Sequence, residues 1–273
     1  MRIEDYPPQE PFSENARKYH LETLRLGEGI LPAREISYGA SPYQSLAVFP
    51  ASKPDGRVLL FVHGGGWTNG YKEWMYFMAP PLNAAGVTFI SAGYRLAPGH
   101  VFPAAYEDVA AAFGRVYDLL GEVGGDASKL YVGGHSAGGH YAALLATRAD
   151  WRRARWPAAN PVRGCLPISG VFRFGEGSGL SMRPRFLGPP DAEVDKAASP
   201  VVGIEDRTPF LIVHGDRDFP HLMTQGAEME TELKRLSIPV ERIVLEGADH
   251  FGASYAAADP NGVWVQAALK FMS

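Results

Sequence analysis

The chain has 273 residues, of which 46% are hydrophobic and 21% are charged, and its formal net charge is −4. A chain of this length and composition can bury a large core without help from disulfides or metals. The slight negative charge offers nothing to attract nucleic acid or an anionic membrane. We therefore exclude those partners and expect a small-molecule substrate, neutral or apolar.

Cysteine content and the N-terminal segment favour a soluble, cytoplasmic protein. The only cysteine, Cys165, lies in an apolar run, so we interpret it as a buried strand residue, and no intrachain disulfide can form. The opening stretch "MRIEDYPPQEPF" lacks the apolar segment of a signal peptide, and no run of about 18 apolar residues is present to span a bilayer. A homodimer is a candidate assembly.

Eight short apolar runs predict strands. Residues 34–39 and 44–51 resemble an opening pair of strands. Most of the later runs are almost continuously hydrophobic, which is typical of strands covered on both faces of a parallel sheet. These later runs are residues 57–65, 86–94, 129–136, 163–171, 210–216 and 241–247.

Helical patterns lie between the strand runs. Apolar residues recur at helical spacing over residues 103–123, and further helices are predicted at 137–148, 222–236 and 260–272. This alternation predicts an α/β fold with a mostly parallel central sheet of about eight strands and helices on both faces. Ligands are then expected at the carboxyl ends of the strands. We expect one domain over residues 1–273.

Two segments fall outside the alternation. Residues 172–208 are rich in glycine, proline and charge, and residues 1–34 lead into the first predicted strand. Each could be a lid over a ligand site or only a surface connection, and the sequence leaves both interpretations open.

A glycine-rich bend joins the strand run that ends near residue 135 to the helix at 137–148. Here Gly134-His135-Ser136-Ala137-Gly138 matches the pattern G-x-S-x-G between a predicted strand and a predicted helix. That setting is typical of a nucleophile elbow, in which a tight turn exposes the serine hydroxyl. Ser136 is the candidate nucleophile, and the alternative is a serine that only belongs to a turn.

A serine nucleophile needs a base, and His250 is the best-placed of eight histidines. It follows the last predicted strand, which suits the chain order serine, acid, histidine found with a nucleophile elbow. A capping or core histidine is the alternative role for His250. His135 and His140 lie too close to Ser136 in sequence for the usual approach from another loop. We expect His135 to line the site and His140 to pack on the helix.

The orienting acid should follow the strand before His250. The stretch "FLIVHGDRDFP" offers Asp216 and Asp218, both at the carboxyl end of a predicted strand. From there a carboxylate can reach the imidazole and select its tautomer. We favour Asp218, which lies further around the loop, and interpret Asp216 as a turn residue.

Backbone amides for an oxyanion site are expected after the strand run at 57–65. Three consecutive glycines in "LLFVHGGGWTNG" let amides turn inward, and the predicted donors are Gly65, Gly66 and the amide of Ala137. A flexible turn is the alternative. A phosphate-binding loop would need a following Lys-Ser/Thr or a G-x-G-x-x-G pattern, whereas Trp67 follows here.

These motifs resemble those of α/β hydrolases, close to the hormone-sensitive-lipase-like esterases and the arylformamidases (kynurenine formamidases). "HGGGW" at 63–67 resembles their oxyanion motif, and "AGYRLAPGHVFPAAYEDV" at 92–109 resembles the esterase stretch "YRLAPEHPFPAA", with Gly99 in place of the usual Glu. "HGDRD" at 214–218 resembles the H-G-x-x-D motif, which places the acid on Asp218. The resemblance covers about residues 35–271 and implies an α/β-hydrolase fold.

The surroundings of Ser136 divide the resemblance between two activities. "GGHSAGGH" at 133–140 departs from the esterases, which usually carry Asp before the serine, and His135 and "ISGVF" at 168–172 are closer to the arylformamidases. The resemblance implies a carboxylesterase for small or medium acyl esters, with an arylformamidase as the second candidate. A binding protein on a hydrolase-like fold is the third. No cluster has metal-ligand spacing, so we expect no metal and no cofactor.

Trp67 and His135 are the predicted substrate-binding residues. Trp67 begins an aromatic stretch that also holds Tyr71, Trp74, Tyr76 and Phe77. These rings could form a binding wall, although for most of them the packing face of a helix is the interpretation we favour.

Overall fold

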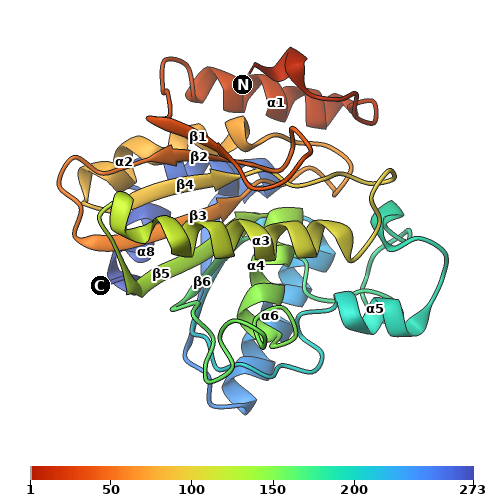
Figure 1. Cartoon of the computed structure of the whole chain (residues 1–273). Coiled ribbons are helices and arrows are strands. Elements are labelled where there is room, and N and C mark those ends of the chain that lie inside the picture. The colour runs from red at the N-terminus through yellow and green to blue at the C-terminus, as the bar shows by residue number, and fades with distance from the viewer. Residues whose placement is uncertain (1) are drawn as a thin grey trace.

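The computed structural model describes residues 2–273, which are built around one sheet of eight strands (Figure 1). The strands are β1 (Arg34–Ser37), β2 (Ser45–Phe49), β3 (Gly56–Val62), β4 (Thr88–Ala92), β5 (Gly125–His135), β6 (Cys165–Ile168), β7 (Phe210–Arg217) and β8 (Val240–Asp249). Their order in the sheet is β1-β2-β4-β3-β5-β6-β7-β8. β2 pairs antiparallel with β1 and with β4, and the remaining neighbours are parallel.

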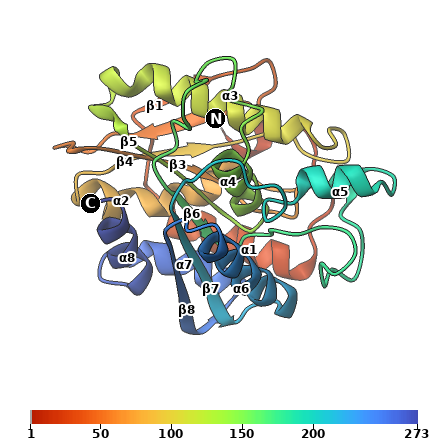
Figure 2. The same ribbon diagram turned by 90° about the horizontal axis from the view of Figure 1, so that it is seen from below.

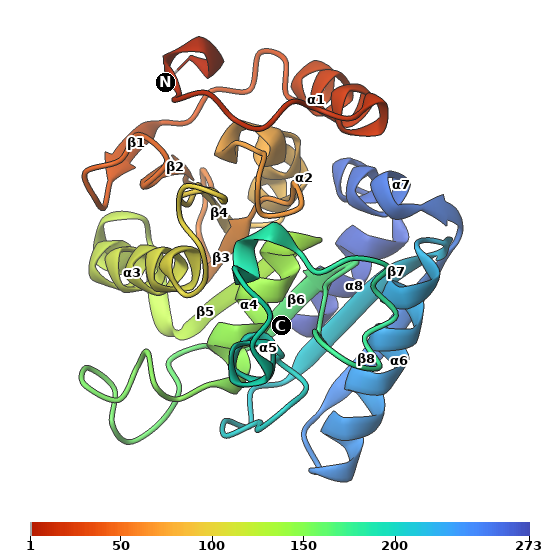
Figure 3. The same ribbon diagram turned by 90° about the vertical axis from the view of Figure 1, so that its right-hand side faces the viewer.

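Helices cover both faces of the sheet. The described residues form α1 (Glu14–Leu26), α2 (Ala79–Ala84), α3 (Ala104–Leu119), α4 (Ala137–Thr147), α5 (Ala192–Ala198), α6 (Pro220–Arg235), α7 (His250–Tyr255) and α8 (Val263–Phe271). Short 3₁₀ turns are η1 (Ile3–Asp5), η2 (Lys72–Met78), η3 (Leu120–Glu122), η4 (Arg185–Leu187) and η5 (Ala256–Ala258). Figure 2 and Figure 3 show α3, α4 and α6 on one face and α2 and α8 on the other.

The parallel register places several loops at one edge of the sheet. Val62 of β3 lies opposite Gly134 of β5, and His135 lies opposite Ile168 of β6. Arg217 of β7 lies opposite Asp249 of β8. The residues that follow these strand ends therefore emerge side by side, although they come from distant parts of the chain.

The architecture confirms the predicted α/β fold with a mostly parallel sheet and helices on both faces. Each of the eight predicted strand runs overlaps a strand, and the four predicted helices overlap α3, α4, α6 and α8. The strands in the middle of the sheet are buried, as their continuous apolar sequences indicate. None of the helices found in residues 2–273 is both long and apolar enough to span a bilayer.

The N-terminal helix α1 is an element that the apolar pattern does not reveal. It buries only Tyr19 and Thr23, so it carries no continuous apolar stripe. Its local signal is a cap, because the Ser13 side chain accepts a hydrogen bond from the Ala16 amide. α1 packs on η2, and Figure 3 shows α1 at the top of the molecule.

The two segments outside the strand–helix alternation touch each other. Arg185 of η4 forms an ion pair with Glu10, which precedes α1. The segment 172–208 also contains α5, whose N-cap Asp191 accepts hydrogen bonds from two backbone amides. Whether either segment opens as a lid stays a prediction.

Candidate active site

Ser136 occupies a sharp turn between β5 and α4. Its backbone angles are φ 53° and ψ −117°, a conformation that L-residues rarely adopt. The two glycines of the motif allow the turn to pack closely. A Cβ at Gly138 would lie 2.0 Å from the carbonyl oxygen of Val62, and one at Gly134 would lie 2.3 Å from the carbonyl carbon of Gly138. Larger residues therefore do not fit at either glycine.

Ser136, His250 and Asp218 form a hydrogen-bonded series. Nε2 of His250 lies 3.0 Å from Oγ of Ser136, and Nδ1 of His250 lies 2.9 Å from Oδ1 of Asp218. His250 is the first residue of α7, and the preceding Asp249 caps that helix by accepting from the amides of Phe251 and Gly252. The cap thus helps to hold the imidazole at the edge where Ser136 emerges.

The carboxylate of Asp218 is buried and fully hydrogen-bonded. Oδ2 accepts from the Ser169 hydroxyl, and Oδ1 also accepts from the Phe219 amide at 2.7 Å. Burial by itself raises the pKa of Asp218, but the bond and charge of His250, together with these donors, lower that pKa to about 2. Asp218 is therefore ionised at neutral pH.

Asp216, the alternative acid, has a different role in the structure. Its carboxylate is exposed and accepts a hydrogen bond from the Gly247 amide at 2.8 Å. It therefore links the end of β7 to β8, and the interpretation of Asp216 as a turn residue is wrong because Asp216 is part of strand β7. Ser169 donates to Asp218, but it was not predicted from the sequence as a site residue. Its stretch "ISGVF" was noted only for its resemblance to the arylformamidases.

The loop after β3 forms a closed turn beside Ser136. The Gly65 carbonyl accepts from the amides of Thr68 and Asn69, and Gly65 has φ 121°. A Cβ at Gly65 would lie 2.0 Å from the Asn69 carbonyl oxygen, so the turn requires glycine there. Gly65 and Gly66 both line the cavity next to Ser136. Ala137 begins α4, where first-turn amides have no partner within the helix.

Trp67 points away from this cavity. Its indole Nε1–H donates to Nδ1 of His140 at 3.1 Å, and its ring stacks on Phe186 with centroids 4.4 Å apart. Trp67 is not among the residues that line the cavity, so its predicted contact with substrate gains no support and stays a prediction. His140 is buried on α4, where its Nε2–H donates to the Ala198 carbonyl.

His135 lines the cavity, but both of its ring nitrogens are bonded within the protein. Nε2 lies 3.0 Å from the carbonyl oxygen of His250, and Nδ1 lies 3.2 Å from the Tyr19 hydroxyl. Burial lowers the pKa of His135 to about 3, so the ring is neutral. The imidazole therefore has no free nitrogen to offer a ligand.

A cavity of about 330 Å³ opens above Ser136. Its walls include four aromatic rings and neutral polar groups. The lining residues are Ser13, Asn15, Ala16, Tyr19, Gly65, Gly66, Thr68, Asn69, Trp74, His135, Ser136, Phe219, His250 and Phe251. The lining contains no Lys, Arg, Asp or Glu, so burial of a charged group here would lack a compensating ion pair.

Several of these lining residues were missed by sequence reasoning. Phe219 and Phe251 directly follow Asp218 and His250 in the chain, and that adjacency was an available signal. The contribution of residues 13–19 had no local signal, because only the packing of α1 on η2 brings them over the cavity.

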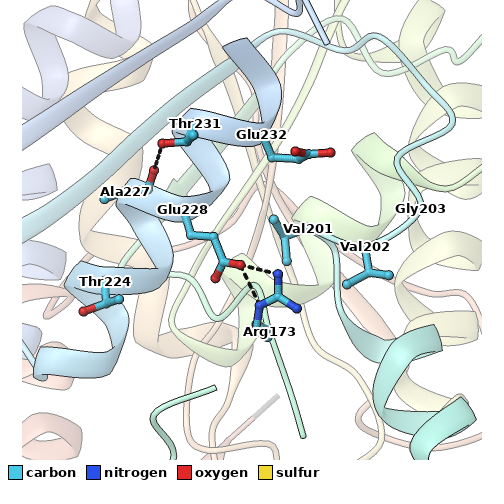
Figure 4. A pocket seen from close by; sticks show the side chains of 9 residues that line it. All are labelled: Arg173, Val201, Val202, Gly203, Thr224, Ala227, Glu228, Thr231 and Glu232. Carbon is cyan, nitrogen blue, oxygen red and sulfur yellow. Dashed lines mark hydrogen bonds and ion pairs between the residues drawn. The ribbon is translucent and has the colours of Figure 1, made fainter. Parts of the chain in front are cut away.

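A larger cavity of about 660 Å³ lies elsewhere, between α6 and residues 201–203 (Figure 4). Its charged side chains are all in ion pairs, since Arg173 donates to Glu228 and Glu232 is paired with Arg235. It holds none of the residues of the hydrogen-bonded series. Among residues 2–273, no group of three His, Cys, Asp or Glu side chains is placed to hold a metal ion.

A mostly parallel sheet with a serine at a strained turn, and an acid and a histidine at neighbouring strand ends, defines the α/β-hydrolase class. A family model described as the alpha/beta hydrolase fold matches residues 59–253, and the chain belongs to this family. The predicted resemblance is thereby confirmed.

Curated relatives include both of the predicted activities. Esterase LipC of Mycobacterium tuberculosis is 30% identical over 239 residues, which cover 80% of this chain and 59% of LipC. Kynurenine formamidase of Danio rerio is 28% identical over 140 residues, which cover 50% of this chain and 45% of the formamidase. The match thus spans about half the length of these relatives.

Solved esterase structures share the fold. A hyperthermophilic esterase from the archaeon Pyrobaculum calidifontis superposes with a TM-score of 0.72 at 23% sequence identity. The superposition covers 93% of this chain and 88% of that esterase. At this identity the likeness supports the fold and not the substrate.

Proposed function

We propose that this protein is a serine hydrolase that cleaves small or medium carboxylic esters through an acyl-enzyme. The observation that carries the proposal is the series from Ser136 through His250 to Asp218, with distances of 3.0 Å and 2.9 Å. A serine, a histidine and a buried carboxylate in this order are the groups that nucleophilic acyl transfer requires.

In the first step, the serine hydroxyl attacks the acyl carbonyl. The ionised Asp218 accepts from Nδ1–H of His250, which leaves Nε2 free to take the hydroxyl proton of Ser136. Negative charge develops on the carbonyl oxygen as the C–O bond to Ser136 forms. The amides of Gly65, Gly66 and Ala137 are the proposed donors to that oxygen.

The alcohol then leaves, and water releases the acyl group from the enzyme. The protonated His250 gives its proton to the departing alcohol, and the alcohol leaves as the bond to the acyl carbon breaks. Water then enters, loses a proton to Nε2 and attacks the acyl-enzyme carbonyl. Collapse of the intermediate returns the proton to Ser136 and releases the carboxylic acid.

The cavity supports uncharged substrates of modest size. Its volume of about 330 Å³ is at the lower end of small-molecule sites. Tyr19, Trp74, Phe219 and Phe251 supply apolar wall area, and no Lys, Arg, Asp or Glu side chain lines it. Ester groups, which carry no charge, lose little free energy on entering such a site.

Arylformamidase activity is the second candidate. It is favoured by the match to kynurenine formamidase and by the aromatic walls, which suit a flat ring. The same residues would cleave a formamide, with an aromatic amine as the leaving group. N-formylkynurenine also carries an ammonium and a carboxylate, for which the lining offers no ion pair.

Turnover of short p-nitrophenyl esters, measured beside turnover of N-formylkynurenine and of the neutral analogue formanilide, tests the proposal. We expect the esters to react fastest and formanilide to react faster than N-formylkynurenine. The control is Ser136→Ala, which removes the nucleophile. Ester turnover that persists in this variant, or fast cleavage of N-formylkynurenine beside slow ester cleavage, would contradict the esterase proposal.

Labelling with a fluorophosphonate separates an enzyme from a binding protein on the same fold. The reagent reacts with a serine only where a base activates the hydroxyl. We expect one adduct, located on Ser136 by peptide mass spectrometry, and none in Ser136→Ala. An unlabelled native protein would favour the binding-protein alternative.

A further inference from the structure

Tyr19, on α1, lies at the centre of the aromatic wall. Its ring makes a T-shaped contact with Trp74 at a centroid distance of 5.2 Å and lies 5.1 Å from Phe251. Its hydroxyl lies 3.2 Å from Nδ1 of His135 and 2.9 Å from Oγ of Ser254. A helix from the N-terminal part of the chain is thereby bonded to the end of β5 and to α7.

The direction of each hydrogen bond in this network follows from the chemistry of its ends. The His250 carbonyl can only accept, so Nε2 of His135 carries a proton and donates to it. Because burial keeps His135 neutral, Nδ1 has no proton and accepts from the Tyr19 hydroxyl. The Ser254 hydroxyl then donates to the Tyr19 oxygen. Ser254 therefore donates to Tyr19, Tyr19 donates to His135, and His135 donates to the backbone carbonyl of His250.

We propose that Tyr19 is a positioning residue: its hydroxyl donates to Nδ1 of His135 and so holds that ring where its Nε2–H binds the His250 carbonyl and keeps the backbone of His250 in place. The inference rests on the proposed function, because it concerns where the base sits relative to Ser136. In the other tautomer Nε2 would present a lone pair to the His250 carbonyl, and two acceptors repel each other.

The network of hydrogen bonds contacts the helix that carries His250 at two points. His250 and Ser254 are four residues apart on α7, so they lie on the same face of that helix, one turn apart. One end of the network bonds to Ser254 and the other end bonds to the His250 carbonyl. Tyr19 and His135 therefore clamp the first turn of α7, from which the imidazole of His250 reaches Ser136.

The test replaces Tyr19 with phenylalanine, which keeps the ring in the cavity wall and removes only the hydroxyl. We expect Tyr19→Phe to lower kcat for p-nitrophenyl acetate by about 30-fold with little change in KM, because small displacements of a base cost rate. Tyr255→Phe is the matched control. Its ring stacks on Tyr19 at 5.6 Å, but its hydroxyl is outside the network and the residue does not line the cavity.

Two results would overturn the inference. A Tyr19→Phe variant with unchanged kcat and a raised KM would make Tyr19 a substrate contact only. Equal losses in Tyr19→Phe and Tyr255→Phe would show a general effect of removing hydroxyls from the ring cluster.

A double-variant comparison and a spectrum make the test specific. Adding Tyr19→Phe to His135→Asn should cause no further loss of kcat, since Tyr19 acts through His135. A double variant whose loss of kcat is the product of the two single losses would contradict this coupling. Nitrogen-15 NMR of the imidazoles should show His135 as the Nε2–H tautomer in the native protein, and in Tyr19→Phe the Nδ1 resonance should move because that nitrogen has lost its hydrogen-bond donor. This readout keeps the test decisive if His135→Asn does not fold.

The outcomes separate this inference from the proposed function. Native protein that is inert to both p-nitrophenyl acetate and the fluorophosphonate contradicts the proposed function itself. Native protein that is active, with Tyr19→Phe equally active and the Nδ1 resonance of His135 unmoved, contradicts only the role of Tyr19.

Discussion

Nε2 of His250 lies 3.0 Å from Oγ of Ser136, although 114 positions separate the two residues in the chain. Ser136→Ala and His250→Ala should each lower kcat for a short ester by roughly several thousandfold or more, because the hydroxyl and its base act as one unit. For the same reason the double variant should be no slower than either single one. Initial rates of p-nitrophenyl ester hydrolysis, beside thermal melts that confirm folding, check this. Clearly different losses of kcat in the two single variants would contradict the prediction that Ser136 and His250 act as one unit.

The two aspartates at the end of β7, Asp216 in the strand and Asp218 just after it, should differ sharply in their effect on activity. Asp218→Asn should lower kcat by about 10⁴-fold, because an amide facing Nδ1 favours the wrong tautomer of His250. Asp216→Asn should leave kcat nearly unchanged, since its carboxylate is exposed and bonds only the Gly247 amide. The comparison uses one substrate and one pH. A larger loss in Asp216→Asn would reassign the acid.

Residues before α1 should support the proposed oxyanion loop. The Gln9 side chain donates to the Gly70 carbonyl and accepts from the Gly70 amide, both at 2.9 Å, and the Asn69 side chain donates to the Glu10 carbonyl at 2.6 Å. Gln9→Ala should weaken binding of a boronic acid, a tetrahedral mimic, by about tenfold while product affinity stays constant, because only the mimic needs the donors in place.

A matched glutamine provides the control for this experiment. Gln266 also donates to a backbone carbonyl, that of Pro260, but it lies on α8 and does not line the cavity. Gln266→Ala should leave boronate affinity as in the native protein. If Gln9→Ala leaves it unchanged as well, the loop holds its shape without the N-terminal segment.

Buried histidines should make the folded protein less stable in mild acid. Burial lowers the pKa of His63 to about 4 and the pKa values of His135 and His140 to about 3, below the ordinary value near 6.5. Between these values and about pH 6.5 the unfolded chain binds protons that the folded chain does not, so the free energy of unfolding falls as pH falls. Each such histidine contributes a slope of up to about 1.4 kcal/mol per pH unit.

Replacing one of these histidines should reduce that slope. His140→Gln keeps a donor for the Ala198 carbonyl but removes the titration. Urea unfolding across pH 4.5 to 7 should then give a slope that is smaller by about 1.4 kcal/mol per pH unit at the acid end. An unchanged slope would mean that folded His140 already carries a proton in this range.

Much of the site was predictable because its parts are local in the sequence. The elbow around Ser136 has a strand before it, a helix after it and glycines where a Cβ would collide with backbone. The glycine-rich loop at 63–66 and the ends of β7 and β8 are equally local patterns. Once the parallel order of the strands is given, these ends meet at one edge of the sheet.

Other relationships depend on contacts between distant segments. Trp67 stands next to the proposed oxyanion glycines in sequence, yet it turns to stack on Phe186, more than a hundred residues later. Ser169 supports Asp218 only because β6 and β7 are neighbours in the sheet. No periodicity in the sequence expresses either contact.

By itself the sequence determined the α/β class, the turn that carries Ser136, and Asp218 and His250 as its candidate partners, because hydrophobic periodicity and glycine placement are local properties of a chain. The tertiary structure alone decided that α1 lies over the cavity and that Trp67 faces away from it. It also decided that both ring nitrogens of His135 are hydrogen-bonded, one to Tyr19 and the other to the His250 carbonyl. The physical reason is that a polar helix with two buried residues has many surfaces it could cover, and only the assembled core selects one of them.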